Sequence, residues 1–106
     1  MKVLITATAP LLSAKVDERF GRAVFFIVVD TDKGDFKSVE NENVNNASGA
    51  GMAAAQTVIR INPDIVITGN CGPKAEQLLT AANIKIRTGF SGTVEDALKS
   101  AKENCL

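Results

Sequence analysis

The sequence predicts a mixed α/β fold, in which a five-stranded sheet lies between helices in three layers. Two observations support this prediction. After residue 48, short apolar runs alternate with segments of helical periodicity, which is the pattern of β-α-β units. Before residue 48, apolar runs flank a polar turn that contains Gly34, which is typical of antiparallel strands. With 106 residues and 45% apolar content, we expect one globular domain over residues 1–106.

The first half of the chain is expected to form three strands. Residues 3–7 are a nearly unbroken apolar run, which suits a central strand buried on both faces. Residues 25–29 are rich in aromatic and β-branched side chains, which favour strands. The polar stretch at residues 30–35 predicts a hairpin turn, and residues 36–41 form the returning strand.

The second half is expected to contain three helices and two strands. Ser48 is a suitable N-cap for a first helix, which ends at Asn62 because Pro63 cannot continue it. The strands are expected at residues 65–68 and 84–87.

The second and third helices carry their own start signals. Pro73 suits the first position of the second helix. Thr93 and Asp96 have the spacing of a capping box, in which each side chain binds the other residue's backbone N–H group.

Right-handed crossovers join these elements into a sheet of strand order 3-2-1-4-5, which is also the order of the ribonuclease-H-like scaffold. The chain moves outward in opposite directions from the first and the fourth strand. The point between these two strands is therefore a topological switch point, where ligands bind beyond the carboxyl ends of the strands.

The segments that follow the first, third, fourth and fifth strands are expected to meet at one edge of the sheet, which we call the glycine rim. They are residues 8–22, 45–51, 69–73 and 88–92, and they contain seven of the eight glycines: Gly21, Gly49, Gly51, Gly69, Gly72, Gly89 and Gly92. The N-termini of the helices, with free N–H groups and positive dipole ends, point to this rim. Arg19 and Arg22 add positive charge, so the rim predicts an anion-binding site.

Cys71 is the most suggestive side chain of the rim. It lies at the N-terminus of the second helix, a position that lowers the pKa of a thiol and favours the thiolate that binds soft metals. Equally, a cysteine can be a small apolar core residue. Cys105 is expected near the opposite edge, so we predict no disulfide, and Cys71 is the candidate metal ligand. A metal bound there has to bring other ligands of its own.

Composition excludes several classes of function. There is no His, which excludes a Ser-His catalytic pair and a His-ligated zinc site. The 12 basic and 12 acidic side chains give a net charge of zero, which argues against nucleic-acid binding. The N-terminal residues do not read as a signal peptide, and no apolar run reaches the roughly 20 residues of a membrane span. We therefore expect a reduced, cytoplasmic protein.

Four segments resemble the dinitrogenase iron-molybdenum cofactor biosynthesis family. They are VDERFGRA at residues 16–23, FIVVD at 26–30, GAGMAA at 49–54 and DIVITGNCGPKA at 64–75. The resemblance covers residues 1–101, and its specific parts are Phe20-Gly21-Arg22-Ala23 and the Gly-x-x-Gly-Pro motif at residues 69–73. It implies a ribonuclease-H-like fold and a non-enzymatic role. Members of this family bind or carry iron-sulfur-based precursors of the nitrogenase cofactor, or act as nitrogenase accessory proteins.

One residue departs from the family pattern. The position before Phe20 is commonly His in the family, and here it is Arg19. This change removes a ligand and adds a fixed charge. We therefore expect Arg19, Arg22 and the helix N-termini to hold an anionic cluster electrostatically.

These observations predict a small carrier or accessory protein that binds an iron-sulfur or iron-molybdenum-type cluster as cargo. A protein that donates or accepts the cluster is a further expected partner, whereas nucleic acid and membranes are not. The candidate binding residues are Arg19, Phe20, Gly21, Arg22, Gly49, Gly51, Gly69, Asn70, Cys71 and Gly72, with Cys71 also the candidate metal ligand.

Two alternatives stay open. The carboxylates of Asp17, Glu18, Asp30, Asp32 and Asp64 could hold Mg²⁺ for a nuclease-like phosphoryl transfer, although the first strand lacks the acidic residue that such a nuclease needs. The second alternative is an interaction module without a small ligand.

A separate signal, the segment Gly49-Ala50-Gly51, resembles a dinucleotide-binding fingerprint but lacks its third glycine.

Overall fold

The computed structural model describes residues 1–41 and 49–103, and these residues form a mixed sheet with three helices. The elements are β1 (Lys2–Ala7), β2 (Phe25–Asp30), β3 (Asp35–Glu40), α1 (Ala50–Ile61), β4 (Ile65–Ile67), α2 (Pro73–Ala81), β5 (Lys85–Arg87) and α3 (Val94–Glu103). The strand order is β3-β2-β1-β4-β5, which confirms the predicted order. Strand β2 runs antiparallel to β1 and β3, while β4 runs parallel to β1 and β5. The ribonuclease-H-like label stays a prediction.

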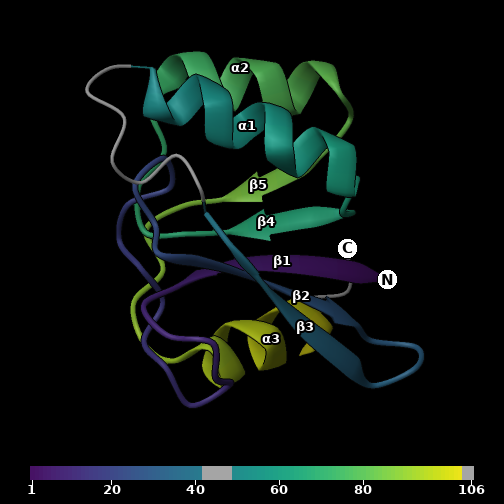
Figure 1. Cartoon of the computed structure of the whole chain (residues 1–106). Helices are drawn as coiled ribbons and strands as arrows, with labels where there is room; N and C mark the ends of the chain where they lie inside the picture. The colour runs from purple at the N-terminus through teal and green to yellow at the C-terminus, as the bar shows by residue number, and fades with distance from the viewer. Residues whose placement is uncertain (42–48, 104–106) are drawn as a thin grey trace.

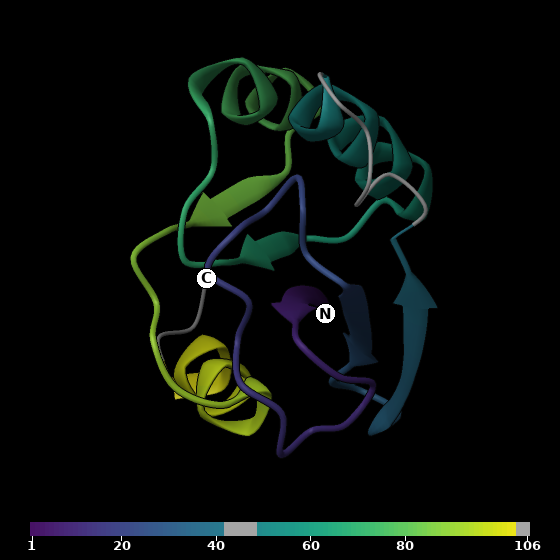
Figure 2. The ribbon, with the colours of Figure 1, turned by 60° about the vertical axis from the view of Figure 1, so that its left-hand side comes forward.

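The three expected layers are present. Helices α1 and α2 lie side by side on one face of the sheet, and α3 covers the other face (Figures 1 and 2). Strand β1 is buried on both sides, because Leu4 belongs to the apolar cluster under α1 and α2 while Val3 and Ile5 belong to the cluster under α3. This explains why its sequence is a continuous apolar run instead of an alternating one.

The start of α3 follows its local sequence signal, whereas α1 begins without a side-chain cap. The capping box of α3 is confirmed, since Thr93 N–H donates to Asp96 Oδ2 and Asp96 N–H donates to Thr93 Oγ1, both at 3.1 Å. Helix α1 begins at Ala50, and its N-cap is Gly49, in the left-handed region with a φ of 72°. The predicted N-cap, Ser48, lies outside the described residues.

The two outer strands, β3 and β5, are edges of the sheet. Most side chains of β3 are exposed, and Figure 1 shows the hairpin end of this strand lying away from α1 and α2. Among the described residues, no helix is long and apolar enough to cross a membrane. Cys105, predicted to lie near the edge opposite the glycine rim, is outside the described residues.

Candidate functional site

The described parts of the four rim segments meet at one edge of the sheet, as predicted; Figure 2 brings this edge forward. Arg19 forms a parallel bridge with Asn70, and Phe20 N–H donates to Asn70 O at 3.0 Å. Gly89 N–H donates to Gly69 O at 2.7 Å, which joins the segment after β5 to the segment after β4. Residues 45–48 of the predicted rim lie outside the described residues.

Two glycines of the rim allow the backbone segments to pack closely. A Cβ atom on Gly21 would lie 2.7 Å from the Cα atom of Gly51, in the first turn of α1. A Cβ atom on Gly69 would lie 2.6 Å from the Cα atom of Glu18. Both glycines therefore hold the rim together and are not left open to a ligand.

Asp17 anchors the loop between β1 and β2. Its carboxylate is only 3% exposed and accepts hydrogen bonds from the backbone N–H groups of Arg19 (3.1 Å) and Val24 (3.3 Å). The backbone carbonyl oxygen of Asp17 accepts a bond from the Thr6 hydroxyl at 2.8 Å, and Thr6 Oγ1 in turn accepts the hydroxyl of Thr68 at 2.8 Å. The loop is thus fixed to the carboxyl ends of β1 and β4, on either side of the switch point.

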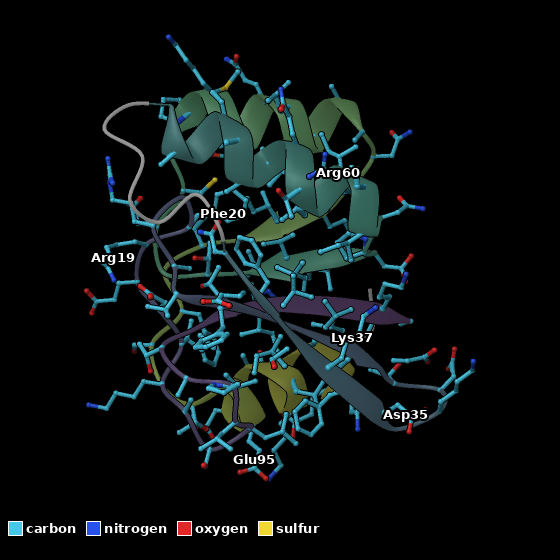
Figure 3. The ribbon with its side chains drawn as sticks, in the orientation of Figure 1. Arg19, Phe20, Asp35, Lys37, Arg60 and Glu95 are labelled. Carbon is cyan, nitrogen blue, oxygen red and sulfur yellow. The ribbon has the colours of Figure 1, made fainter. Side chains whose placement is uncertain are left out.

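Asp17 also changes the expected role of Arg19. The Arg19 guanidinium donates to the same carboxylate, with Nε 3.2 Å from Oδ1 and Nη2 3.4 Å from Oδ2. These bonds raise the pKa of Arg19. The Arg19 side chain is 60% exposed on the outer side of the rim (Figure 3), but its charge faces a buried carboxylate. Arg19 is therefore not the independent cation that the sequence predicted. Arg22 lies exposed on the same loop.

The Phe20 side chain belongs to the core. It is 2% exposed, and its ring centroid lies 6.1 Å from that of Phe26 with an interplanar angle of 33°. Figure 3 shows it pointing inward from the rim, whereas Arg19 points outward. The predicted contact of Phe20 with a ligand is therefore wrong for its side chain, which packs under α1 instead.

The prediction of a lowered thiol pKa is wrong. Cys71 is buried within the apolar cluster under α1 and α2. Burial, with a smaller contribution from the negative charge of Glu76, raises the pKa of Cys71 to about 11. Loss of hydration outweighs the helix N-terminus, so the thiol is protonated at neutral pH.

A hollow of about 350 Å³ lies where the first turns of α1 and α2 meet, and we call it the helix-end hollow. It is lined by Gly49, Gly51, Met52, Gly72, Pro73, Lys74 and Ala75. Three of these were predicted from the sequence, namely Gly49, Gly51 and Gly72. Met52 and Lys74 were missed, although both lie within two residues of a predicted glycine. Among the residues that the structure describes, no acidic side chain lines the hollow.

The described residues do not support the magnesium alternative. They contain no group of three or more His, Cys, Asp or Glu side chains that could hold a metal ion. Most of the candidate carboxylates have structural partners instead. Asp17 binds Arg19, Asp30 accepts the N–H groups of the turn after β2, Asp32 pairs with the N-terminal ammonium, and Asp64 accepts Lys2 N–H at 2.7 Å.

Comparisons with known proteins agree with this architecture. The family described as dinitrogenase iron-molybdenum cofactor matches residues 1–104. The apo form of the orange protein from Desulfovibrio gigas is 36% identical, with a TM-score of 0.93 over 97% of this chain and 88% of that chain. The NMR structure of a NifB-like protein of the DUF35 family from Thermotoga is 33% identical, with a TM-score of 0.82 over 96% of this chain and 87% of that one. An uncharacterized protein of Methanocaldococcus jannaschii is 23% identical over 99 residues, which are 91% of this chain and 84% of the relative.

Proposed function

Because the chain belongs to the dinitrogenase iron-molybdenum cofactor family, we propose that it is a non-enzymatic carrier that holds an anionic metal-sulfur cluster as cargo. The family and the similar structures support a cofactor-related accessory role. The Desulfovibrio gigas protein is described as orange and its structure as the apo form, which supports a bound group in that protein. The proposed cargo here is of the iron-sulfur or iron-molybdenum type.

The observation that carries this proposal is the helix-end hollow. The first N–H groups of a helix have no partner within the helix, and each N-terminus is equivalent to about half a positive charge. Two such ends, with Lys74 beside them and no carboxylate among the described lining residues, favour a negatively charged occupant. Backbone groups can approach this occupant closely because Gly49, Gly51 and Gly72 carry no side chain.

The remaining rim residues have supporting roles in this proposal. Arg22 and the partly neutralised Arg19 offset cluster charge. Gly21, Gly69 and Asn70 hold the rim segments together, and Phe20 anchors them to the core.

Sulfur ligands at this end of the molecule are few. Cys71 precedes Gly72 and is the proposed metal ligand, and its high pKa means that a metal has to displace the thiol proton. Met52, which is 37% exposed in the lining of the hollow, offers a second soft donor.

A charge placed in the hollow tests the proposal. Gly72 is the N-cap of α2 in extended backbone, and nothing lies within 4 Å of a Cβ atom built on it. A Gly72→Asp variant should therefore fold, and its carboxylate should cap α2 as well as glycine does or better. Gly72→Asn is the matched control, since asparagine has the same shape and capping ability without the charge.

The measurement is anaerobic incubation with ferrous iron and sulfide, followed by desalting, visible absorbance and iron analysis. We expect wild type and Gly72→Asn to retain iron and sulfide, and Gly72→Asp to retain at least tenfold less. Cys71→Ala should also lose most of the iron if the thiol ligates it. Negligible iron on wild type, or equal iron on the Asp and Asn variants, would refute the proposed site.

A further inference from the structure

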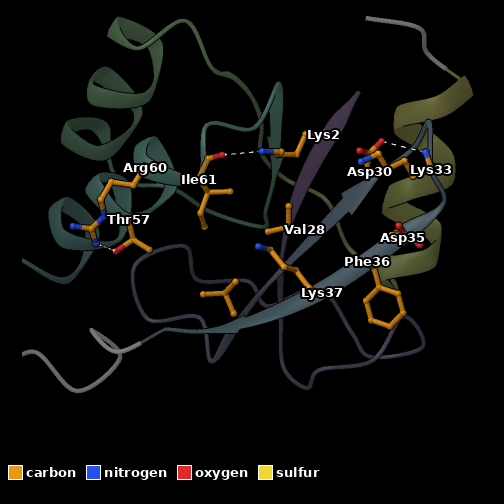
Figure 4. A pocket seen from close by; sticks show the side chains of 11 residues that line it. Lys2, Val28, Asp30, Lys33, Asp35, Phe36, Lys37, Thr57, Arg60 and Ile61 are labelled. Atoms are coloured by element: carbon orange, nitrogen blue, oxygen red, sulfur yellow. Dashed lines mark hydrogen bonds between the residues drawn. The ribbon is translucent and has the colours of Figure 1, made fainter.

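A second hollow, of about 690 Å³, lies at the other end of α1, and we call it the basic groove. It opens between the C-terminal turns of α1 and strands β2 and β3 (Figure 4). Val28, Val39 and Ile61 contribute apolar surface to it. None of its lining residues lines the helix-end hollow, so the two hollows are separate.

Positive charge exceeds negative charge in this groove. Four cationic side chains line it, from Lys2, Lys33, Lys37 and Arg60, against the two carboxylates of Asp30 and Asp35. Lys2 Nζ donates to the carbonyl oxygen of Ile61 at 3.1 Å, and Arg60 Nη2 donates to Thr57 Oγ1 at 3.3 Å, so both bind neutral groups. Within the part of the chain that the structure describes, no carboxylate lies within ion-pair distance of any of the four cations.

The two carboxylates do not cancel this excess. Asp30 Oδ1 accepts the backbone N–H groups of Asp32 at 3.0 Å and Lys33 at 3.2 Å, and therefore serves the turn between β2 and β3. Asp35 lies at the far end of β3 from Val39, beside that turn. The stretch of groove between Lys37 and Arg60 is thus the part with uncompensated positive charge.

Strand β3 borders the groove and is an edge of the sheet. Among the described residues it pairs with β2 alone, which leaves one side of its backbone without a neighbouring strand. Its side chains alternate between the two faces. Lys37 points into the groove, whereas the Phe36 side chain, which also borders the groove, points away from Lys37 and is 44% exposed (Figure 4). A strand added beside β3 would place alternate side chains next to Lys37 and next to Phe36.

The lining favours carboxylates over phosphate. Phosphate sites usually combine glycines with helix N-termini, and neither lines this groove. The helix end at the groove is the C-terminal end of α1, whose carbonyl groups carry negative partial charge and therefore repel a phosphate, with close to two negative charges, more than a carboxylate with one. Lysines beside an open strand edge suit an extended acidic segment, because main-chain bonds give affinity and alternate side chains give specificity.

We propose that β3 and the basic groove bind an extended segment of a partner protein that alternates acidic and apolar residues. The acidic side chains of the partner segment lie beside Lys37 and face Lys2 and Arg60. The apolar side chains of that segment cover Phe36. Antiparallel pairing of β3 with a second copy about Lys37 would set two lysines side by side, and like charges on opposed strands are destabilising. Pairing about Phe36 would instead set Lys37 opposite Asp35, so self-association is one outcome that the test has to measure.

The test uses two peptides with blocked ends, one alternating valine with glutamate over eight residues and one alternating valine with lysine. Binding is measured from backbone amide chemical shifts of the protein. We expect the glutamate peptide to shift the amides of residues 35–40, to bind at least tenfold more tightly than the lysine peptide, and to weaken as salt rises.

The matched variants are Lys37→Glu and Lys85→Glu, because Lys85 is an exposed lysine on β5, the other edge strand. Lys37→Glu should weaken the glutamate peptide at least tenfold and Lys85→Glu less than twofold. Lys37→Gln gives the same comparison without charge reversal. The proposal would be overturned by equal binding of the two peptides or by equal effects of the two variants. It would also be overturned by amide shifts confined to β5, or by self-association in sedimentation that Lys37→Glu changes. No step of this test involves a cluster, so its outcome is independent of the proposed cargo.

Discussion

Replacing Gly21 by alanine should destabilise the protein by about 1–3 kcal/mol, the usual cost of forcing an extra group into a packed interior. The added Cβ atom would lie 2.7 Å from both the Cα and the N atom of Gly51 and 3.0 Å from the carbonyl carbon of Ala50. Ordinary contact begins near 3.4 Å, and all three atoms are backbone, so no side chain can rotate away. The first turn of α1 or the rim loop has to move.

Gly51→Ala is the control, although Gly51 is the residue that Gly21 contacts. A Cβ atom on Gly51 points elsewhere and meets Ala75 Cβ at 3.8 Å, an ordinary contact. Alanine also has the higher helix propensity, by up to about 1 kcal/mol. Gly51→Ala should therefore leave stability unchanged or raise it.

Urea unfolding followed by far-UV circular dichroism measures both variants, since the chain has no Trp or Tyr for fluorescence. With a urea m-value of about 1–3 kcal/mol/M, each kcal/mol shifts the unfolding midpoint by roughly 0.3–1 M urea. Equal stabilities for Gly21→Ala and Gly51→Ala, or a loss confined to Gly51→Ala, would refute this account of the packing between the rim loop and α1.

Two further predictions concern Cys71 and Asp17. In a Cys105→Ser background, Cys71 should react with iodoacetamide at pH 8 far more slowly in the folded than in the unfolded protein, because a pKa raised from 9.0 to about 11 lowers the thiolate fraction. Because the folded state holds the Cys71 proton more tightly, the contribution of this thiol to the free energy of unfolding is complete below pH 9 and is lost as pH rises towards 11. Fast alkylation of the folded protein would contradict the burial of Cys71. Asp17→Ala should cost about 2–4 kcal/mol, because it leaves the N–H groups of Arg19 and Val24 without their acceptor. Arg19→Ala should lower the free energy of unfolding by under about 1 kcal/mol, because that side chain is largely exposed. If Arg19→Ala is instead the more destabilising of the two in urea unfolding, the guanidinium, and not the backbone N–H donors, is what stabilises the Asp17 carboxylate.

The sequence predicted the sheet well because its signals are local and periodic. The apolar run of β1 and the capping box of Thr93 and Asp96 each involve neighbouring residues, and the structure confirms both. The strand order followed from the right-handed crossover rule, which does not depend on side-chain detail.

The site residues were harder to predict because their roles depend on contacts between distant segments. Gly21 meets Gly51, thirty positions later, and no local pattern marks that approach. At Cys71, a helix N-terminus and burial act on the pKa in opposite directions, and the sequence shows the first but not the second. The Asp17 carboxylate reaches the N–H group of Val24 only because the loop turns back on itself.

The pairing of Arg19 with Asp17 reduces the positive charge that the loop between β1 and β2 offers to an anion. A guanidinium that already binds a buried carboxylate contributes less to a ligand than a free one. Among the described residues, no carboxylate lines the hollow at the helix ends, and Glu76 lies in the first turn of α2 outside that lining, so the proposed seat for an anion shifts to α1 and α2. At the position where the family resemblance implies a His, the chain has Arg19, which fixes the loop through Asp17.

Helix α1 connects the two proposed sites. Its first turn lines the helix-end hollow, and its last turn, with Arg60 and Ile61, lines the basic groove. Twelve residues at 1.5 Å each separate these ends by about 18 Å. A carrier has to hold its cargo and contact the protein that supplies or receives it, and a docking surface over the cargo site would block release. Placing the two at opposite ends of one rigid helix allows both to be occupied together, so the acidic peptide should bind equally well to loaded and unloaded protein.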